Sequence, residues 1–160
     1  MKKLFLVFAL SLTAVCAMAQ NLSSLSKAAR MAYEYLDKEG YKPYIDEDGD
    51  VSFKVQGTLF YVDNDKDDTT LLRMIAPGVY KIDTDNVVEE YTALSACNDF
   101  NRTKKLIRAA ISSSGSVSFI ADTYVGEGKN DMTEFLETAI DFMTRGFASW
   151  RELFNEYNDD

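Results

Sequence analysis

Apolar side chains recur at alternating steps of three and four residues near the start of the chain, a spacing typical of one helix face. The residues that follow this spacing are Leu22, Leu25, Ala29, Ala32 and Leu36. Gly40 comes shortly after them, and glycine commonly ends helices because it adopts left-handed backbone conformations without strain. The pattern therefore predicts a helix over residues 23–39.

The apolar period changes to two after residue 50, which indicates strands. Val51, Phe53 and Val55 alternate with polar residues, as in a strand with one buried face. In residues 58–62 both alternating sets are apolar or aromatic. We therefore expect this second strand to be central and covered on both faces.

Three further strands are predicted by runs of β-branched and aromatic residues between turn signals. The first covers residues 69–76 and is closed by Pro77 and Gly78. The other two, residues 105–112 and 116–124, flank a Ser-Ser-Gly turn and are expected to form a hairpin.

Two more helices follow from capping residues and apolar spacing. Asp83 and its neighbours supply an N-cap and a negative first turn for a helix to about Asn101. Its apolar positions are Val87, Val88, Tyr91 and Leu94. Residues 131–157 carry a wide apolar stripe, so a long helix should cover one face of the sheet. Gly146 within it marks a kink or a close helix contact.

The order of these elements is helix, three or four strands, helix, two strands, helix. Grouped strands and segregated helices predict an α+β fold rather than alternating βαβ units. We expect an antiparallel sheet of about five to six strands. An N-terminal helix, a middle helix and a long C-terminal helix would flank it, all in a single domain over residues 20–160.

The first residues have the three parts of a cleavable signal peptide. Lys2 and Lys3 precede an apolar stretch, and the small-residue triplet 17–19 follows it. The apolar stretch is shorter than the roughly twenty residues that span a bilayer. Residues 1–19 are therefore expected to be removed, which leaves a periplasmic or secreted protein without an integral membrane segment. The alternative is a lipid anchor on Cys16.

The chain is strongly acidic, with 17 basic and 26 acidic residues and a net charge of −9. Loss of residues 1–19 removes Lys2 and Lys3 and no acidic residue, which leaves 15 basic residues and a net charge of −11. Such a surface repels the phosphate backbone, so nucleic acid is excluded as a partner. Cys97 would then be the only cysteine, which excludes a disulfide within the monomer.

The sequence has no histidine, which excludes Ser-His-Asp triads, Cys-His pairs and histidine-ligated metal sites. Cys97 lies inside a predicted helix and is expected to be a small core residue. The acidic runs 46–50 and 63–68 lack the glycine and glutamate spacing of a calcium loop, so turn positions are expected for them. No catalytic residue, metal ligand or cofactor is predicted.

Four polar side chains are candidates for contact with a partner. Asn98 and Asn101 share one face of the middle helix and are able to hold a partner's backbone. The alternative is that they cap the helix or bind the following loop. Tyr41 and Tyr44 are able to line a groove, or else they belong to the core with a solvated hydroxyl.

Residues 33–55 contain the pairs Gly40-Tyr41 and Gly49-Asp50, the latter after Asp46, and residues 98–101 read Asn-Asp-Phe-Asn. These motifs resemble the YbjN-like family of candidate bacterial sensory-transduction regulators, over about residues 31–155. The family is similar in fold to type III secretion chaperones, which bind other proteins and often form dimers. The resemblance implies no catalytic residue. With its predicted signal peptide, this sequence differs from the family members that lack one.

These observations together predict an exported, non-enzymatic protein-binding or chaperone-like module of the bacterial envelope. Its partner would be another envelope protein or a second copy in a dimer. Two alternatives remain: a self-associating structural protein of the envelope, and an enzyme that uses paired carboxylates on an extracellular polymer.

Overall fold

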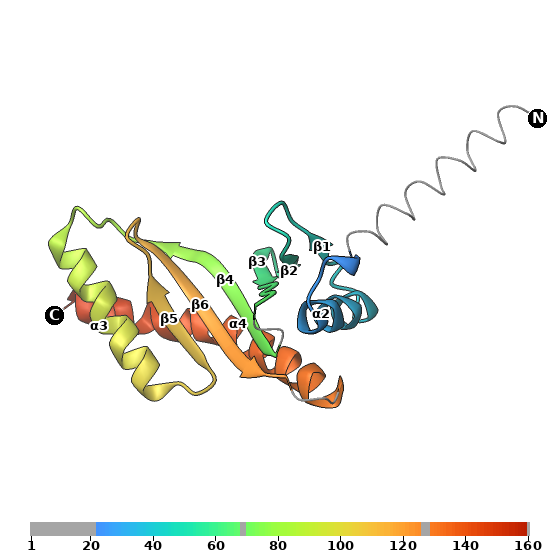
Figure 1. The fold of residues 1–160 in the computed structure, drawn as a ribbon. Helices are drawn as coiled ribbons and strands as arrows, with labels where there is room; N and C mark the ends of the chain where they lie inside the picture. The colour runs from blue at the N-terminus through green and yellow to red at the C-terminus, as the bar shows by residue number, and fades with distance from the viewer. Residues whose placement is uncertain (1–21, 68–69, 126–128, 160) are drawn as a thin grey trace, which may run out of the picture.

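The computed structural model describes residues 22–67, 70–125 and 129–159. The predicted signal peptide and Cys16 lie outside these residues. The elements, shown in Figure 1, are α2 (Lys27–Lys38), β1 (Tyr44–Ile45), β2 (Val51–Val55), β3 (Thr58–Val62), β4 (Leu71–Lys81), α3 (Val87–Thr103), β5 (Ile107–Ile111), β6 (Ser116–Tyr124) and α4 (Lys129–Asp159). This order confirms the predicted α+β fold, with β1 as the fourth strand before the middle helix.

The strands form one antiparallel sheet in the order β1-β2-β3-β4-β6-β5. Directly paired residues on one face are all buried, in a row that crosses five strands: Val51, Val62, Met74, Ala121 and Ile107. The adjacent row on the other face contains Tyr61, Ile75 and Ile120, which are only half-buried. The sheet thus has one core face and one open face, as antiparallel sheets commonly do.

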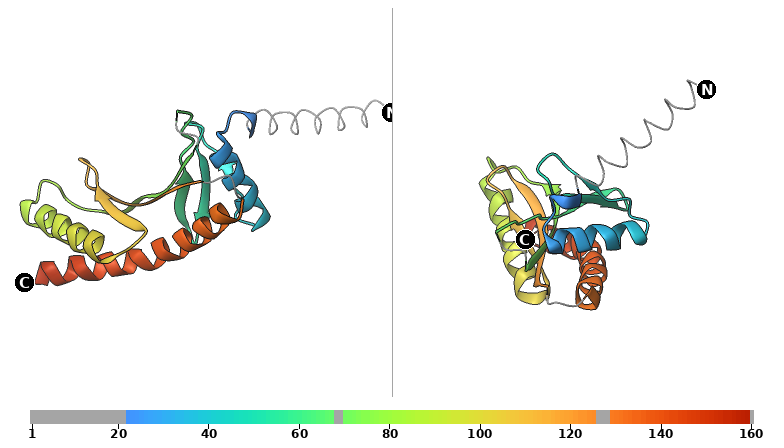
Figure 2. Two further views of the ribbon diagram at one scale, coloured as in Figure 1. Left: turned by 60° about the horizontal axis from the view of Figure 1, so that its bottom comes forward. Right: turned by 45° about the vertical axis from the view of Figure 1, so that its right-hand side comes forward.

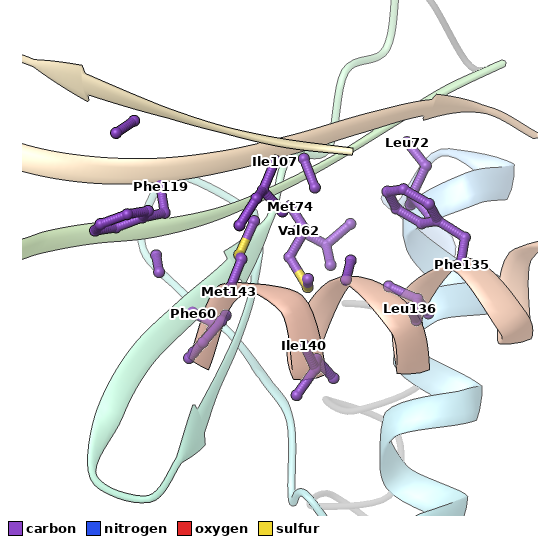
Figure 3. Close-up of a cluster of buried hydrophobic side chains, with 14 of the residues drawn as sticks. Phe60, Val62, Leu72, Met74, Ile107, Phe119, Phe135, Leu136, Ile140 and Met143 are labelled. Atoms are coloured by element: carbon purple, nitrogen blue, oxygen red, sulfur yellow. The ribbon is translucent and has the colours of Figure 1, made fainter. Parts of the chain in front are cut away.

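Helix α4 runs along the core face, with α2 and α3 near its opposite ends (Figure 2). Figure 3 shows Leu136, Ile140 and Met143 of α4 beside Val62 and Met74 of the sheet. The long apolar stripe of α4 therefore covers one face of the sheet, as its sequence predicts. Among the described residues, no helix is both long enough and apolar enough to cross a bilayer.

The ends of α2 show how local sequence sets an element's bounds. The Ser26 side chain accepts a hydrogen bond from the Ala29 amide at the N-cap, 3.1 Å away. At the other end Gly40 has a φ of 85°, and the Tyr41 amide donates to the Leu36 carbonyl at 2.9 Å. These bonds close the helix where Gly40 predicts it.

Two strand predictions were wrong in part. Strand β3 lies inside the sheet as predicted, but it is buried on one face only, because Leu59 and Tyr61 lie on the open face. Strand β4 does not end at Pro77 and Gly78. It continues to Lys81 through a bulge, in which the three residues between Ala76 and Tyr80 face a single residue of β6. A bulge accommodates proline because it leaves the missing amide out of the ladder.

Candidate protein-binding surface

Helix α3 exposes four large apolar side chains to solvent. Its buried residues are mostly small: Thr92, Ala93, Ala96, Cys97 and Phe100. Its exposed residues are Val87 at 75%, Val88 at 69%, Tyr91 at 71% and Leu94 at 53%. We call these four residues the outer face of α3. The sequence predicts them as the helix's apolar positions, but the structure buries the opposite side.

Close packing explains why the small residues face inward. At Gly146 of α4, a Cβ atom would lie 2.7 Å from Ile107 Cδ1 and 3.1 Å from Phe100 Cζ. Helix α4 therefore approaches β5 and α3 more closely than a side chain at this position allows. Gly146 marks a close contact, one of the two roles its position predicts, and it makes room for the Phe100 ring, while the other buried residues of α3 are small.

The end of α4 supports the outer face of α3. Tyr157 is 39% exposed, and its hydroxyl donates a hydrogen bond to the carboxylate of Asp99 on α3. This bond, with help from Arg102, lowers the pKa of Asp99, and it raises the pKa of Tyr157. The contact pins the C-terminal turns of α4 to α3.

The Asn101 side chain forms hydrogen bonds to the backbone of its own chain, whereas the sequence suggested that it could hold a partner's backbone. Its side-chain amide donates to the Ala109 carbonyl at 3.0 Å, and the Ala109 amide donates back to Asn101 Oδ1 at 2.8 Å. Ala109 belongs to β5, which forms one edge of the sheet. The asparagine thus pairs an edge strand in the way that another strand would.

The other three candidate residues have different surroundings. Asn98 is exposed on α3. The Tyr41 ring packs edge-on against Phe53 in the core, with centroids 5.8 Å apart. Tyr44, on β1, is 49% exposed. Tyr41 follows α2 and Tyr44 belongs to β1, whereas both asparagines belong to α3, and α2 and α3 lie at opposite ends of the molecule (Figure 1). They form no common site.

The two acidic runs hold turns. Asp46 accepts hydrogen bonds from the Asp50 amide at 2.9 Å and from the Ser52 hydroxyl at 2.8 Å. Asp50 in turn accepts from the Asn64 amide, which joins the two runs. Burial raises the pKa of Asp50, and neighbouring carboxylates raise it further. No cluster of three or more metal-ligating side chains occurs in the part of the chain that the structure describes.

Cys97 sits in the core beneath α3. The indole N–H of Trp150 donates to its sulfur at 3.2 Å, and the residue is 7% exposed. Burial raises the pKa of the thiol. A buried thiol with a raised pKa is a poor nucleophile, so the geometry supports the packing role that the sequence predicts.

The fold belongs to the class of α+β proteins in which one antiparallel sheet packs against helices on one face. Neither a protein-family model nor the sequence of a curated protein matches this chain. Solved structures do. E. coli YbjN, a candidate transcription regulator, is 10% identical with a TM-score of 0.52, over 71% of this chain and 84% of YbjN.

Two other structures share the fold. The Yersinia pestis type III secretion chaperone SycH, solved with a stable fragment of YscM2, is 13% identical, with a TM-score of 0.52. The match covers 78% of this chain and 99% of SycH. An uncharacterised protein of Methanothermobacter thermautotrophicus is 10% identical, with a TM-score of 0.50. The match covers 79% of this chain and 99% of that protein. The predicted likeness to YbjN and to type III secretion chaperones is confirmed for the fold.

Proposed function

We propose that this protein is a non-enzymatic binding module that holds another polypeptide on the outer face of α3. The observation that carries the proposal is the exposure of Val87, Val88, Tyr91 and Leu94 on a helix whose other side is fully packed. Contiguous exposed apolar side chains commonly mark interaction sites, whereas scattered ones do not.

The shape and composition of this surface favour a protein over a small molecule. A helix face is convex, and small ligands are usually bound in concave sites. Tyrosine is enriched among the residues that dominate protein interfaces, and Tyr91 lies between the two valines and Leu94. The acidic side chains Glu89 and Glu90 beside it would form the polar rim. The shared fold of SycH, solved with a fragment of another protein, supports the same reading.

We propose that the protein acts in the bacterial envelope. Its basis is the signal-like start of the sequence, with Lys2 and Lys3 before an apolar stretch. Cleavage after Ala19 gives a soluble periplasmic or secreted form, and lipidation of Cys16 gives an anchored one. The intact mass of the protein purified from its native envelope distinguishes these two forms.

The test is capture of a partner with matched surface variants. Wild type, the double variant Tyr91→Gln/Leu94→Gln, and the control Tyr124→Gln are crosslinked mildly in envelope extract. Tyr124 is 77% exposed but lies on β6, away from α3. We expect one recurrent partner that the double variant loses and the control keeps. A partner held equally by all three proteins contradicts the proposal.

Self-association is the second candidate, because one apolar helix face is able to pair with its copy across a two-fold axis. Sedimentation of the same three proteins separates it from the first. A wild-type dimer that becomes a monomer in Tyr91→Gln/Leu94→Gln identifies the partner as a second copy. A wild-type monomer excludes this candidate and leaves a different protein as the partner.

A further inference from the structure

A basic groove lies at the far end of α3 from most of the outer face. Its volume is about 330 Å³, and it is bounded by the end of α3, the start of β5 and the middle of α4. Lys104, Lys105 and Arg145 surround it, and Ile107, Phe142 and Gly146 supply its apolar surface. We call this cavity the basic groove.

The charge of the basic groove is opposite to that of the molecule. Three cations line it and no carboxylate does, in a chain with a net charge of −9. Arg145 pairs with Asp141 one turn earlier on α4. Lys104 donates to the Ser149 hydroxyl at 3.1 Å, a neutral partner. At least two of the three positive charges therefore remain available to an anion.

Apolar surface lies directly beside these charges. Phe142 is 36% exposed, and the Arg145 guanidinium lies 5.2 Å from its ring centroid. Because Gly146 has no side chain, Ile107 forms part of the groove's lining. A ligand that places a carboxylate on the cations is thus able to place an apolar group against Phe142 at the same time.

The loop that presents the two lysines is held in a strained conformation. Leu106, directly after Lys105, has a φ of 71° and is 39% exposed. A bulky residue in this region is a genuine outlier. Such strain persists where the surroundings fix it and is commonly found at ligand sites. Here it sets the direction in which the chain leaves α3 for β5.

We propose that the basic groove binds a segment of the partner polypeptide in which acidic and aromatic residues alternate. This inference rests on the proposed function, since the segment would belong to the same partner. A peptide fits better than a small molecule, because the volume is near the lower limit for ligand pockets and the lysines and Arg145 at its rim are exposed. A small ligand would stay largely in water, whereas a peptide continues along the rim.

The overall negative charge does not prevent this binding. Charges separated by more than about 8 Å are largely screened at physiological salt, so the nearby cations dominate at the groove. Local attraction also predicts that the affinity falls as salt rises.

The experiment measures fluorescence anisotropy of a labelled peptide that alternates Asp or Glu with Phe. A neutral version carries Asn and Gln, and a third version carries Ala in place of Phe. The groove variant is Lys105→Glu/Arg145→Glu. The control, Arg30→Glu/Lys54→Glu, makes the same change in net charge at exposed positions on α2 and β2. Circular dichroism checks that both variants are folded.

We expect the acidic aromatic peptide to bind best, the groove variant to weaken it about 10-fold or more, and the control to change it less than about 3-fold. Equal binding of the neutral peptide, or equal loss in both variants, overturns the inference. Displacement of the peptide by phenylacetate at equal concentration also overturns it, in favour of a small carboxylate. The capture experiment with Tyr91 and Leu94 decides the proposed function independently, since neither residue lines the groove.

Discussion

Asn101 protects the edge of the sheet with a single side chain. Edge strands expose unpaired backbone groups, which invite pairing with other chains. In β5 the Ala109 amide and carbonyl are both bonded to the Asn101 side chain. A side-chain amide presents an N–H donor and a carbonyl acceptor on the same side, so Asn101 bonds to both backbone groups of Ala109, which would otherwise need a partner strand.

Replacement of Asn101 by Ala is expected to lower the free energy of unfolding by about 1–3 kcal/mol, because Ala109 loses two part-buried hydrogen bonds. The matched control is Asn98→Ala, on an exposed position of the same helix, with a change within about 0.5 kcal/mol. Urea unfolding measures both. Equal effects for the two asparagines would show that the bonds to Ala109 do not stabilise the fold.

The sequence singles out both asparagines but does not separate them. They lie three residues apart, so the helical pattern places them on one face. Only the path of the chain after α3, through the left-handed Leu106, decides that β5 returns beside Asn101 and leaves Asn98 in solvent. A single non-glycine residue with positive φ has no clear sequence signal, and this part of the candidate site was therefore not predictable.

Helix α3 shows how periodicity is misread at the scale of an element. Its large apolar residues follow a helical spacing, and so do its small ones. The apolar stripe with the larger side chains usually faces the core. Here Gly146 leaves room for the one large inward side chain, Phe100. The other inward positions are small, among them Ala93, Ala96 and Cys97, and the larger exposed stripe lies outside.

Two adjacent positions on α3 test this assignment. Leu94→Gln is expected to change the free energy of unfolding by less than about 0.5 kcal/mol, because the side chain is already exposed. Ala93→Gln is expected to cost about 2 kcal/mol or more, since it forces a larger polar group into a fully buried position. Thermal unfolding of both variants checks the contrast. A greater loss for Leu94→Gln would mean that the two faces have been interchanged.

Three neighbouring strands, β4, β6 and β5, are joined by charges on the open face of the sheet. Asp122 on β6 accepts from Arg73 on β4 at 2.8 Å and from Arg108 on β5. Burial acts to raise the pKa of Asp122, but the hydrogen bonds from the two arginines outweigh it and the net pKa is lowered. A lowered pKa in the folded state means that the ionised form stabilises the fold above the unfolded-state value of about 3.9.

Asp122→Asn is therefore expected to lose about 1 kcal/mol of stability near neutral pH, a modest value because both arginines are well exposed. The difference from wild type should shrink as the pH falls through the folded-state pKa of Asp122, where the wild-type carboxylate also loses its charge. Urea unfolding at a series of pH values measures it. A difference that does not depend on pH would exclude the charge as its cause.

The order and arrangement of the helices and strands were more predictable from the sequence than the burial of their individual faces. Element order, the antiparallel sheet and the long covering helix follow from periodicity and caps, because these depend on residues close in sequence. The bulge in β4 and the open outer side of β3 depend on what lies beside them in the sheet. Neither Pro77 nor Leu59 carries that information in its local sequence, so both strands were misassigned there.

Helix α4 contacts both α2 and α3, so the two ends of the molecule share one core. Leu36→Ala in α2 is expected to cost about 2–5 kcal/mol, because this side chain is fully buried. Trp150, stacked on Tyr80 at the other end, reports the effect by fluorescence. The unfolding midpoint measured by Trp150 fluorescence should fall by the same amount as the midpoint measured by circular dichroism. A Trp150 transition left unchanged by Leu36→Ala would mean that the ends unfold independently.

Helix α4 follows every strand of the sheet in sequence, so the core is complete only when α4 is present. Phe60 of β3 and Phe119 of β6 come from strands on either side of β4, and both lie within 6.1 Å of Phe147 of α4 between ring centroids. A chain that lacks α4 leaves much of the core face of its sheet exposed to water, and exposed apolar surface of this kind promotes aggregation. A product truncated before α4 is therefore expected to aggregate.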